Sequence, residues 1–491
     1  MLSYRLGSRD GACFRRLPML GRVFKAYDIR GIYPDLLTDR MGWQIGCGSA
    51  RFLLEEAAND GESTPMMRNV IIGRDMRKSS PTLRDELVRG LTSYHASVID
   101  LGLIDTPMMY FAINYLDASG GVVITASHNP PQYNGFKISK RKAKPVGEST
   151  GLELVRKYAA MVDKNAVPDP AAIVEERDLW KPYAKHVLKF LDLGERDASK
   201  PLKIVVDASN GMAGMMCPKV FGKNGEHVDG LEIIEMNFDI ESGEMAHEPN
   251  PLVASNLDQL CAAVIEQGAD LGLCFDGDAD RCVAVDEKGR IVPCDQMTAL
   301  LASYFLEMEP GASIVYDLRS TKAVEEEILK HGGKPLRGRV GHVFMKQLLA
   351  ENKAIFGGEL SGHFYFRKNF NADSGAIAMC TFLSVLANSG KAMSELIKPM
   401  ARYKQSGEIN FENEEAQEAI ESVMEYYAEK CEIDELDGIT VDCFEDEGWW
   451  VNIRMSNTEP LLRLNAEAKD QETLERIVAE VAPMLGHRVA H

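Results

Sequence analysis

Short runs of apolar, β-branched residues alternate with longer amphipathic segments over most of this chain. In the first part, strand-like runs occur at residues 69–72, 98–101 and 122–125, and a helical pattern covers residues 81–95. Short apolar runs between polar turns are typical of buried strands. Their alternation with helices predicts βαβ units, in which helices cover a mixed or parallel sheet.

The same alternation starts again twice, each time as strand, polar turn and helix. These restarts predict two further units similar to the first, although the sequence identity between units is too weak to establish a duplication. The expected elements are residues 203–207, 231–234, 256–267 and 271–275 in the second unit, and residues 313–317 and 321–331 in the third.

The pattern changes after residue 404. A helix is expected at residues 414–429, then strands at 439–444, 449–455 and 461–467, and a last helix at 471–483. Consecutive strands between two helices are typical of a small α+β domain.

The predicted fold class is therefore α/β, with three similar mixed α/β domains and a C-terminal α+β domain. A polar, proline-containing stretch at residues 164–178 is interpreted as a connection between units. The arginine-rich start resembles a transit peptide, but a disordered extension is the preferred interpretation. The predicted segments are an extension at residues 1–22 and domains at 23–185, 186–290, 291–403 and 404–491.

Composition restricts the kinds of partner. A chain of 491 residues is too long to fold around a single hydrophobic core, so several domains are expected. The formal net charge of −19 argues against nucleic-acid binding through bulk electrostatics. An anionic ligand would therefore need a local basic pocket. No apolar run is long enough to cross a bilayer, so no membrane partner is expected.

The ten cysteines are scattered and form no C-x-x-C pair, which argues against a zinc ribbon or a thioredoxin motif. With no clear secretory signal, a reducing cytoplasm is the expected location.

The most informative motif is Thr-Ala-Ser-His-Asn-Pro, in which Ser127 and His128 follow the apolar run at residues 121–124. Pro130 and Pro131 restrict the backbone, so we expect Ser127 to be displayed rather than packed, as a nucleophilic hydroxyl requires. An ordinary turn is the competing interpretation, because Ser and Asn before Pro are also common in turns.

A second motif places Asp276, Asp278 and Asp280 on alternate positions after a strand-like run. Such carboxylates can converge on one hard divalent cation, and Gly277 allows the backbone to bend. An EF-hand loop is an alternative, but Arg281 stands where that loop requires glycine, and the flanking runs resemble strands. A solvated acidic loop without an ion is the remaining possibility.

A third motif, Gly-Gly-Glu-Leu-Ser-Gly-His, contains Glu359, Ser361 and His363. In an extended backbone Glu359 and Ser361 would share a face, where a carboxylate and a hydroxyl suit neighbouring sugar hydroxyls.

A fourth motif contains Arg454, Ser456, Asn457 and Thr458, and it also forms a turn between two expected strands. A guanidinium group, two hydroxyls and an amide in five residues suit a phosphate dianion.

Together with Phe-Lys-Ala-Tyr-Asp-Ile-Arg-Gly at residues 24–31, these motifs resemble the α-D-phosphohexomutases, most closely the bacterial phosphomannomutase/phosphoglucomutase group. The resemblance extends from Phe24 to the C-terminal helix. It implies four domains around a central cleft, and transfer of phosphate between O1 and O6 of a hexose through a hexose 1,6-bisphosphate. Hexose 1-phosphate and hexose 6-phosphate would be the substrates.

The resemblance also implies roles for individual residues. Ser127 would carry the phosphoryl group, and that phosphate would complete a Mg²⁺ site with the three aspartates. Arg30, His128, Lys137 and His363 would take part in acid–base or polarising work. The substrate contacts would come from Tyr27, Arg281, Arg319, Gly341, His342, Glu359, Ser361, Arg454, Ser456, Asn457 and Thr458.

Two positions depart from the group's pattern and leave the hexose open. Arg319 stands where lysine is frequent, and Val340 where threonine is common. Leu360 stands where glucosamine mutases usually have glutamine, which favours gluco- and manno-configured hexoses. A glucosamine-phosphate mutase, a metal-dependent sugar phosphatase and a sugar-phosphate-binding protein without catalysis are the alternatives. Monomer and homodimer both remain open.

Overall fold

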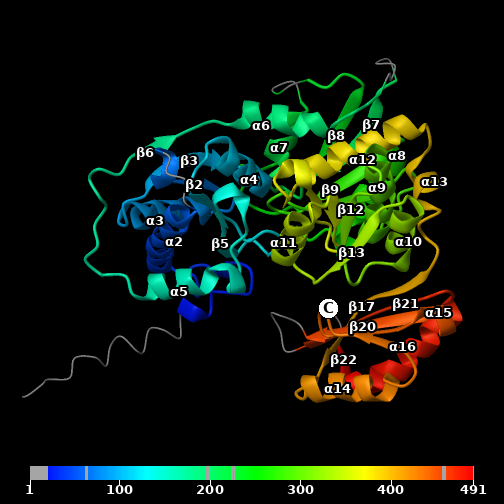
Figure 1. Cartoon of the computed structure of the whole chain (residues 1–491). Coiled ribbons are helices and arrows are strands. Elements are labelled where there is room, and N and C mark those ends of the chain that lie inside the picture. The colour runs from blue at the N-terminus through cyan, green and yellow to red at the C-terminus, as the bar shows by residue number, and fades with distance from the viewer. Residues whose placement is uncertain are drawn as a thin grey trace, which may run out of the picture.

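Four β-sheets with flanking helices organise the protein in this computed structural model (Figure 1). The structure describes residues 20–489 except 61–64, 195–199, 223–224, 226 and 456–460. Most of the expected extension at residues 1–22 therefore lies outside the described residues. Leu20, at its end, is already buried against the core of the first domain.

The first sheet is mixed, with the order β1-β5-β4-β2-β3-β6. Strand β2 pairs in parallel with β3 and β4, whereas β5 is antiparallel to both β1 and β4. The strands are β1 (Ile29–Ile32), β2 (Asn69–Arg74), β3 (Ser97–Leu103), β4 (Gly120–Ile124), β5 (Tyr133–Lys140) and β6 (Val174–Glu176), and the helices are α2 (Asp39–Asn59), α3 (Ser80–Thr92), α4 (Thr106–Tyr115) and α5 (Leu152–Ala160).

Strand β6 lies inside the stretch interpreted from sequence as a connection only. It adds to the edge of the first sheet by parallel pairing of Val174, Glu175 and Glu176 with β3. Its side chains are exposed or half-buried, so it carries no apolar alternation from which a strand could be predicted.

The second sheet has the order β11-β10-β9-β7-β8, and the third has the order β13-β12-β14-β15-β16. One continuous hydrophobic core runs through both domains and reaches one face of the first sheet. The second sheet comprises β7 (Leu202–Asp207), β8 (Leu231–Met236), β9 (Leu271–Phe275), β10 (Cys282–Asp286) and β11 (Ile291–Val292), with α6 (Trp180–Val187), α7 (Ala213–Val220) and α8 (Asp258–Gln267) nearby. The third comprises β12 (Ser313–Asp317), β13 (Lys334–Gly338), β14 (Phe356–Gly358), β15 (Phe364–Phe366) and β16 (Ala372–Asp373), with α9 (Cys294–Met308), α10 (Lys322–Lys330), α11 (His342–Asn352), α12 (Gly375–Ser389) and α13 (Met393–Ile397).

The C-terminal sheet is antiparallel, has the order β18-β19-β20-β21-β17-β22, and encloses a separate core with its helices. In Figure 1 this domain, coloured orange to red, lies below the third domain. Its elements are β17 (Lys404–Glu412), α14 (Ala416–Tyr427), β18 (Glu432–Asp434), β19 (Ile439–Cys443), α15 (Phe444–Glu447), β20 (Trp449–Met455), β21 (Leu461–Ala468), α16 (Gln471–Leu485) and β22 (His487–Val489). The predicted fold class is confirmed.

Polar contacts join the C-terminal domain to the third. The Lys322 backbone N–H at the start of α10 donates to Glu467 Oε1 at 2.9 Å. Arg337 on β13 donates to Asp434 at 2.8 Å. Inter-domain contacts of this polar kind are typical of domains that can move relative to each other.

Cys431 and Cys443 form a disulfide within the C-terminal domain. This disulfide was not predicted, because its two cysteines are 12 residues apart and the prediction from sequence considered only closely spaced C-x-x-C pairs. The Cα atoms are 5.0 Å apart because α14 leads into β18, which pairs with β19. The other cysteines of the described residues are free, and most are buried.

Candidate active site

Ser127 lies in the loop between β4 and β5, at the point where the first and second domains meet. Strand β4 is buried along its whole length, which fixes the start of the loop. Ser127 Oγ donates a hydrogen bond to Asp276 Oδ2 at 2.7 Å, and its backbone N–H donates to Thr125 Oγ1 at 2.9 Å. The prediction that Ser127 is displayed rather than packed is wrong, because only 2% of its surface is exposed. The residue reaches solvent through a pocket rather than standing on a protruding loop.

Two backbone features bring Ser127 close to the acidic loop. Ser127 has a φ of 49°, in the left-handed region, which turns the chain sharply. Gly277 lies against the Ser127 carbonyl, and a Cβ at this glycine would be 2.4 Å from that oxygen. The glycine is therefore required for the close approach of the two loops, in addition to the bend expected from sequence.

Arg77 holds the Ser127 loop in place through hydrogen bonds, and it was not among the residues predicted from the sequence. Its side chain is fully buried and is paired with Asp75 at 2.9 Å. The guanidinium group donates to the carbonyls of Ser127 at 2.9 Å and Asn129 at 2.7 Å. It also donates to those of Pro130 and Tyr133. Four loop carbonyls thus share one buried cation, which compensates polar groups that would otherwise be buried unpaired.

Asp276, Asp278 and Asp280 follow β9 and precede β10, which form an antiparallel pair. The flanking strands exclude the helix–loop–helix arrangement of an EF-hand. All three carboxylates are buried, and one oxygen from each lies within 4.8 Å of the others. Burial, together with Asp280 and Asp278, raises the pKa of Asp276 well above its ordinary value.

This acidic loop fits a hard divalent cation. The Oδ1 atoms of Asp278 and Asp280 are buried and accept no hydrogen bond. Lys137 Nζ lies 2.7 Å from Asp278 Oδ2 and 2.6 Å from Asp280 Oδ2 and offsets part of the charge. Burial opposes the charge on Lys137, but these aspartates raise its pKa, so the side chain is an ammonium.

A pocket of about 500 Å³ opens above Ser127 and is lined by residues from three domains. Arg30 hydrogen-bonds to Asn129 and pairs with Asp28 at its wall. His128 Nδ1 is 3.3 Å from Ser127 Oγ. Burial, and then Arg281 and Arg30, hold the pKa of His128 well below its usual range, so the imidazole is neutral at pH 7. The pocket therefore combines a hydroxyl, a neutral base and several cations.

The third domain contributes His342 and His363 to this pocket, and His363 ends the Glu359 loop. The backbone turns between β14 and β15, so Glu359 and Ser361 do not lie on one extended strand as expected. Glu359 accepts from the Gly341 backbone N–H at 2.8 Å and from the Tyr365 hydroxyl. Ser361 Oγ is instead 2.9 Å from His363 Nδ1. The glycines on both sides of the motif favour this turn over the extended conformation.

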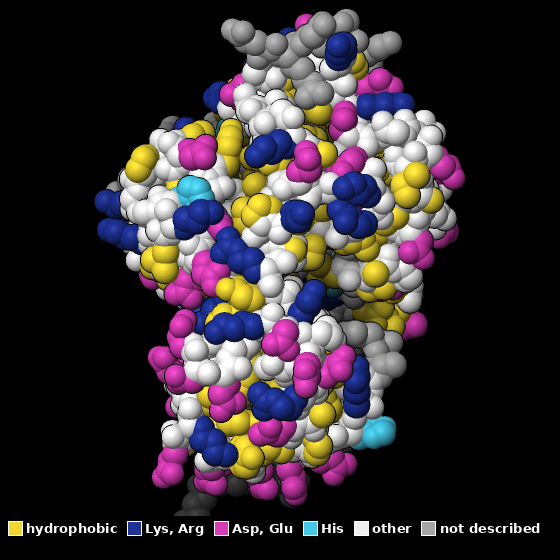
Figure 2. All heavy atoms as spheres, turned by 90° about the vertical axis from the view of Figure 1, so that its right-hand side faces the viewer, with side chains coloured by type: hydrophobic (Ala, Val, Ile, Leu, Met, Phe, Trp, Pro, Cys, Tyr) yellow, Lys and Arg dark blue, Asp and Glu magenta, His cyan; other side chains and the backbone are white. Residues whose placement is uncertain are grey.

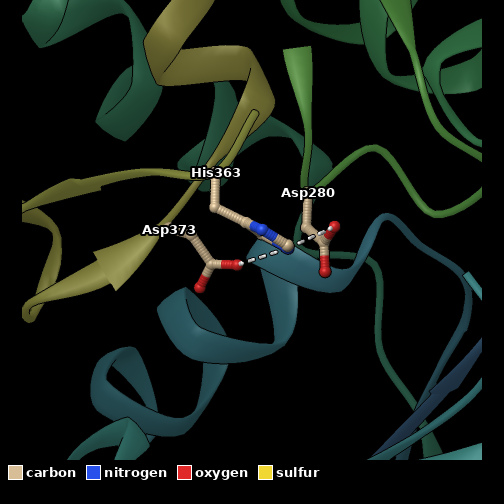
Figure 3. Close-up of side chains that lie close together, drawn as sticks. All are labelled: Asp280, His363 and Asp373. Atoms are coloured by element: carbon tan, nitrogen blue, oxygen red, sulfur yellow. Dashed lines mark ion pairs between the residues drawn. The ribbon is translucent and has the colours of Figure 1, made fainter. Parts of the chain in front are cut away.

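His363 lies between two acidic side chains, Asp280 from the second domain and Asp373 from its own domain (Figure 3). Its Nε2 is 3.3 Å from Asp280 Oδ1 and 3.9 Å from Asp373 Oδ2. Asp373 was not predicted as a site residue, and it pairs with Lys346 at 2.6 Å. His363 therefore connects the acidic loop with the Glu359 loop, as does the bridge between its backbone and that of Arg281.

Tyr27 links the first domain to the loop before α11. Its ring stands edge-on to His342, with centroids 5.7 Å apart, and its hydroxyl is 3.4 Å from the Val340 carbonyl oxygen. Gly341 has a φ of 124° and lies directly under the Tyr27 ring, where a Cβ would collide with it. Tyr27, Gly341 and His342 are thus brought together, as the sequence predicted for the substrate-facing side.

Arg319 and Arg454 meet at the contact between the third and fourth domains. Arg454 Nη2 is 3.1 Å from Glu408 Oε2, and Arg319 Nη1 is 3.7 Å from the same oxygen. Arg463, which was not predicted, is 3.1 Å from Glu408 Oε1. Ser456, Asn457 and Thr458 lie outside the described residues, so this arginine cluster is the described part of the predicted phosphate site.

The arginine cluster is connected to the pocket through the third domain. Asp317 Oδ2 pairs with Arg319 at 3.0 Å and accepts the Leu360 backbone N–H at 2.7 Å. Leu360 follows Glu359 directly. The two ends of the candidate site, Ser127 and Arg454, are therefore joined by hydrogen bonds and ion pairs through all four domains.

Both signs of charge occur on the face of the molecule that Figure 2 shows. On the face in Figure 2, acidic and basic side chains are interspersed, with many acids at the foot of the C-terminal domain. Among the described residues, no helix is both long and apolar enough to cross a membrane.

Comparison with known proteins agrees with this architecture. Family models match residues 21–164, 181–289 and 293–403 as phosphoglucomutase/phosphomannomutase alpha/beta/alpha domains I, II and III, and residues 408–484 as the C-terminal domain. The phosphohexose mutases of Xanthomonas campestris pv. campestris are 37% identical over 475 residues, which cover 94% of this chain and 99% of the relative. The phosphomannomutase of Escherichia coli K12 is 34% identical, over 91% of this chain and 94% of the relative.

Among solved structures, a phosphoglucomutase/phosphomannomutase family protein from Burkholderia thailandensis superimposes with a TM-score of 0.81 at 28% identity. The match covers 94% of this chain and 97% of that protein. The domain order, the site geometry and these matches agree, and the chain belongs to the α-D-phosphohexomutase family, in its bacterial phosphomannomutase/phosphoglucomutase group.

Proposed function

We propose that this phosphohexomutase reversibly transfers a phosphoryl group between O1 and O6 of mannose phosphate, glucose phosphate or both, through a phosphorylated Ser127. The observation that carries the proposal is the position of Ser127 Oγ. It lies 2.7 Å from one carboxylate of the buried acidic loop, opposite a neutral imidazole and beside Lys137. A phosphoryl group on this hydroxyl would lie beside that carboxylate, so a cation held by the acidic loop, together with Lys137, would offset its charge.

In one half of the reaction the bond between phosphorus and Ser127 Oγ breaks as a sugar oxygen takes up the phosphoryl group. In the other half the bond between phosphorus and a sugar oxygen breaks, and the bond to Ser127 Oγ forms again. His128 is suited to accept the proton of the attacking hydroxyl, because its imidazole is neutral. Lys137, which stays charged, and Arg30 are suited to stabilise the oxygens of the group in transfer. The monophosphate thus becomes a hexose 1,6-bisphosphate, which turns over so that its second phosphate meets Ser127.

Asp276, Asp278 and Asp280 would hold one Mg²⁺, with the Ser127 phosphate as a further ligand. When bound, this ion neutralises charge on the phosphoryl oxygens. Without an ion, three buried carboxylates in one loop repel each other, and Lys137, His363 and the more distant Arg281 are the described groups that lie near enough to offset part of this repulsion.

The sugar would lie between the two ends of the site. Tyr27, Arg281, His342 and His363 line the pocket, and Glu359 and Ser361, on the same loop as His363, are suited to bind sugar hydroxyls. The arginine cluster with Arg454 and Arg319 would hold the phosphate that is not being transferred, together with Ser456, Asn457 and Thr458. All four domains of one chain contribute, so a monomer and a homodimer would each carry complete sites.

We place this reaction in the cytoplasm, as the free cysteines of the described residues suggest. The Cys431–Cys443 disulfide is the observation that runs against this location.

The test is a coupled assay with Mg²⁺ and a trace of hexose 1,6-bisphosphate, in which mannose 1-phosphate, glucose 1-phosphate and glucosamine 1-phosphate are compared side by side. We expect conversion of the mannose or glucose ester to the 6-phosphate. Preference for the glucosamine ester would make the protein a glucosamine-phosphate mutase. Release of inorganic phosphate without isomerisation would support a phosphatase instead.

A further inference from the structure

Three guanidinium groups converge on one carboxylate at the contact between the third and fourth domains. Glu408 follows a bulge in β17, between Gln405 and Glu408, that re-aims the strand. Its two oxygens are divided among the cations, because Oε1 lies 3.1 Å from Arg463 while Oε2 lies 3.1 Å from Arg454 and 3.7 Å from Arg319. A planar carboxylate held in this way resembles a bound anion.

The cluster keeps a capacity for further negative charge. Among the described contacts of the cluster, Arg319 is also paired with Asp317, while Glu408 is the carboxylate that all three guanidinium groups share. The side chains of Arg454 and Arg319 are 5% and 9% exposed, and the buried Nε of Arg454 has no hydrogen-bond partner. Burial, together with Arg319 and Arg463, lowers the pKa of Arg454, as expected for cations crowded together.

The sheet itself forces two of these cations together. Arg454 on β20 and Arg463 on β21 are direct cross-strand partners. Like charges at opposed positions destabilise a sheet, and an anion between them offsets this repulsion. Glu408 supplies such an anion, because one of its oxygens lies 3.1 Å from Arg454 and the other 3.1 Å from Arg463.

We propose that Glu408 is an internal competitor of the substrate phosphate, which holds Arg454 and Arg463 when the site is empty and yields them when a phosphate monoester binds. A phosphate dianion carries more charge than a carboxylate and accepts from more donors, so it displaces Glu408. Moving the Glu408 carboxylate away from the guanidinium groups costs free energy, and this cost lowers the affinity of the site for phosphate.

This inference rests on the proposed function, in which a lower affinity of the arginine cluster for phosphate would help the reaction. A bisphosphate that has to turn over must release its phosphate from the arginine cluster before the other end can occupy it. A carboxylate that competes for the same guanidinium groups speeds this release, because most differences in affinity are expressed in dissociation rates.

The decisive experiment measures binding without turnover. In a Ser127→Ala background, the dissociation constants of mannose 1-phosphate, glucose 1-phosphate and inorganic phosphate are compared by calorimetry with and without Glu408→Gln. We expect Glu408→Gln to tighten binding of each by roughly three- to tenfold. Glu408→Asp, which keeps the charge, should retain the parental affinity. Glu412→Gln, an exposed acid on the same strand, should change nothing.

In the enzyme with Ser127 intact, Glu408→Gln should lower KM and kcat together, as expected when tight binding slows release. Unchanged or weaker phosphate binding by Glu408→Gln would overturn the proposal and make Glu408 a positioning residue for the arginines. Unchanged affinity in Arg454→Ala would also overturn it, because phosphate would then bind elsewhere. The proposed function is tested separately, by measuring mutase turnover of the wild-type protein. Its outcome does not depend on the binding results for Glu408→Gln and Arg454→Ala.

Discussion

Ser127 Oγ and Asp276 Oδ2, from two different domains, share a hydrogen bond of 2.7 Å at the base of the pocket. This contact joins the expected phosphate carrier directly to the expected metal loop. A phosphate on this hydroxyl would need the charge of a cation held by the acidic loop, and the contact makes the role of Ser127 directly testable.

Ser127→Ala should reduce mutase turnover by at least about a thousandfold, because no other hydroxyl occupies the position of its Oγ. Binding of a hexose monophosphate should persist, since the arginine cluster is untouched. Coupled kinetics, calorimetry and the intact mass after incubation with hexose 1,6-bisphosphate measure these effects. Ser93→Ala, at the end of α3, is the matched control. Full activity in Ser127→Ala would refute the role given to this residue.

Arg77→Met should lower the free energy of unfolding by about 3–5 kcal/mol, because it leaves Asp75 and four loop carbonyls without their buried cation. Turnover should fall more than monophosphate affinity, since the Ser127 loop loses its support while the arginine cluster does not. Denaturant titration and steady-state kinetics measure the two effects. In the control Arg89→Met, whose side chain is 51% exposed, the loss should stay below about 1 kcal/mol. Equal losses in both variants would contradict the bracing role.

Mg²⁺ should raise the midpoint of thermal unfolding, because an ion bound at Asp276, Asp278 and Asp280 stabilises only the folded state. At a hundredfold excess over its dissociation constant, the ion contributes about 2.7 kcal/mol. Asp278→Asn should abolish this stabilisation, whereas Asp258→Asn at the exposed start of α8 should preserve it. A chelator should remove activity from the wild-type protein. A thermal shift by Mg²⁺ that survives in Asp278→Asn would place the ion elsewhere.

Glu467 should make stability depend on pH at the contact between the third and fourth domains. Burial raises its pKa from 4.5 to about 7. Between these values the folded protein binds more protons than the unfolded chain, so the free energy of unfolding falls as pH rises through this window. Relative to Glu467→Gln, the wild-type protein should lose on the order of 3 kcal/mol between pH 4.5 and 7.

The Glu467 measurement requires denaturant titrations at several pH values, with Glu475→Gln on α16 as the exposed control. Parallel pH profiles for the wild-type protein and Glu467→Gln would show that this carboxyl does not titrate in the window.

Reduction of the Cys431–Cys443 disulfide should lower the stability of the C-terminal domain by about 3 kcal/mol, the value expected for closing a loop of 12 residues. Unfolding with and without dithiothreitol, together with a thiol count in the unfolded protein, measures this effect. A Cys431→Ser/Cys443→Ser variant should be insensitive to the reductant, and Cys261→Ser should respond like the wild-type protein. Equal thiol counts with and without reductant would show that both thiols are free.

Sequence patterns predicted the elements whose burial is periodic. The strand expected at residues 449–455 is β20, and the helix expected at residues 471–483 is α16 with two further residues. Strand β6 escaped prediction because an exposed edge strand has no apolar face. The turn at Glu359 was mistaken for extended chain because alternate polar residues occur in both conformations.

The site residues proposed from the sequence are those whose chemistry is concentrated in a short motif. Ser127, the three aspartates and Glu359 each stand in such motifs, and the structure places Ser127, Asp280 and His363 from three of these motifs around one pocket. Arg77, Asp373, Glu408 and Arg463 stand in no recognised motif, and the contacts that link Arg77 to the Ser127 loop and Glu408 to the arginines join residues far apart in sequence. Only the tertiary structure brings these charges together. The burial of Ser127 depends likewise on the approach of Gly277, which no local pattern encodes.

The left-handed backbone at Ser127 limits which amino acid can carry the phosphate. A branched Cβ is strongly disfavoured at positive φ, so threonine, the other small aliphatic alcohol, is excluded by the backbone before any question of reactivity arises. Glycine and asparagine tolerate this conformation but have no hydroxyl. The same turn that aims the oxygen at the acidic loop therefore leaves serine as the one genetically encoded aliphatic alcohol that this position accommodates without strain.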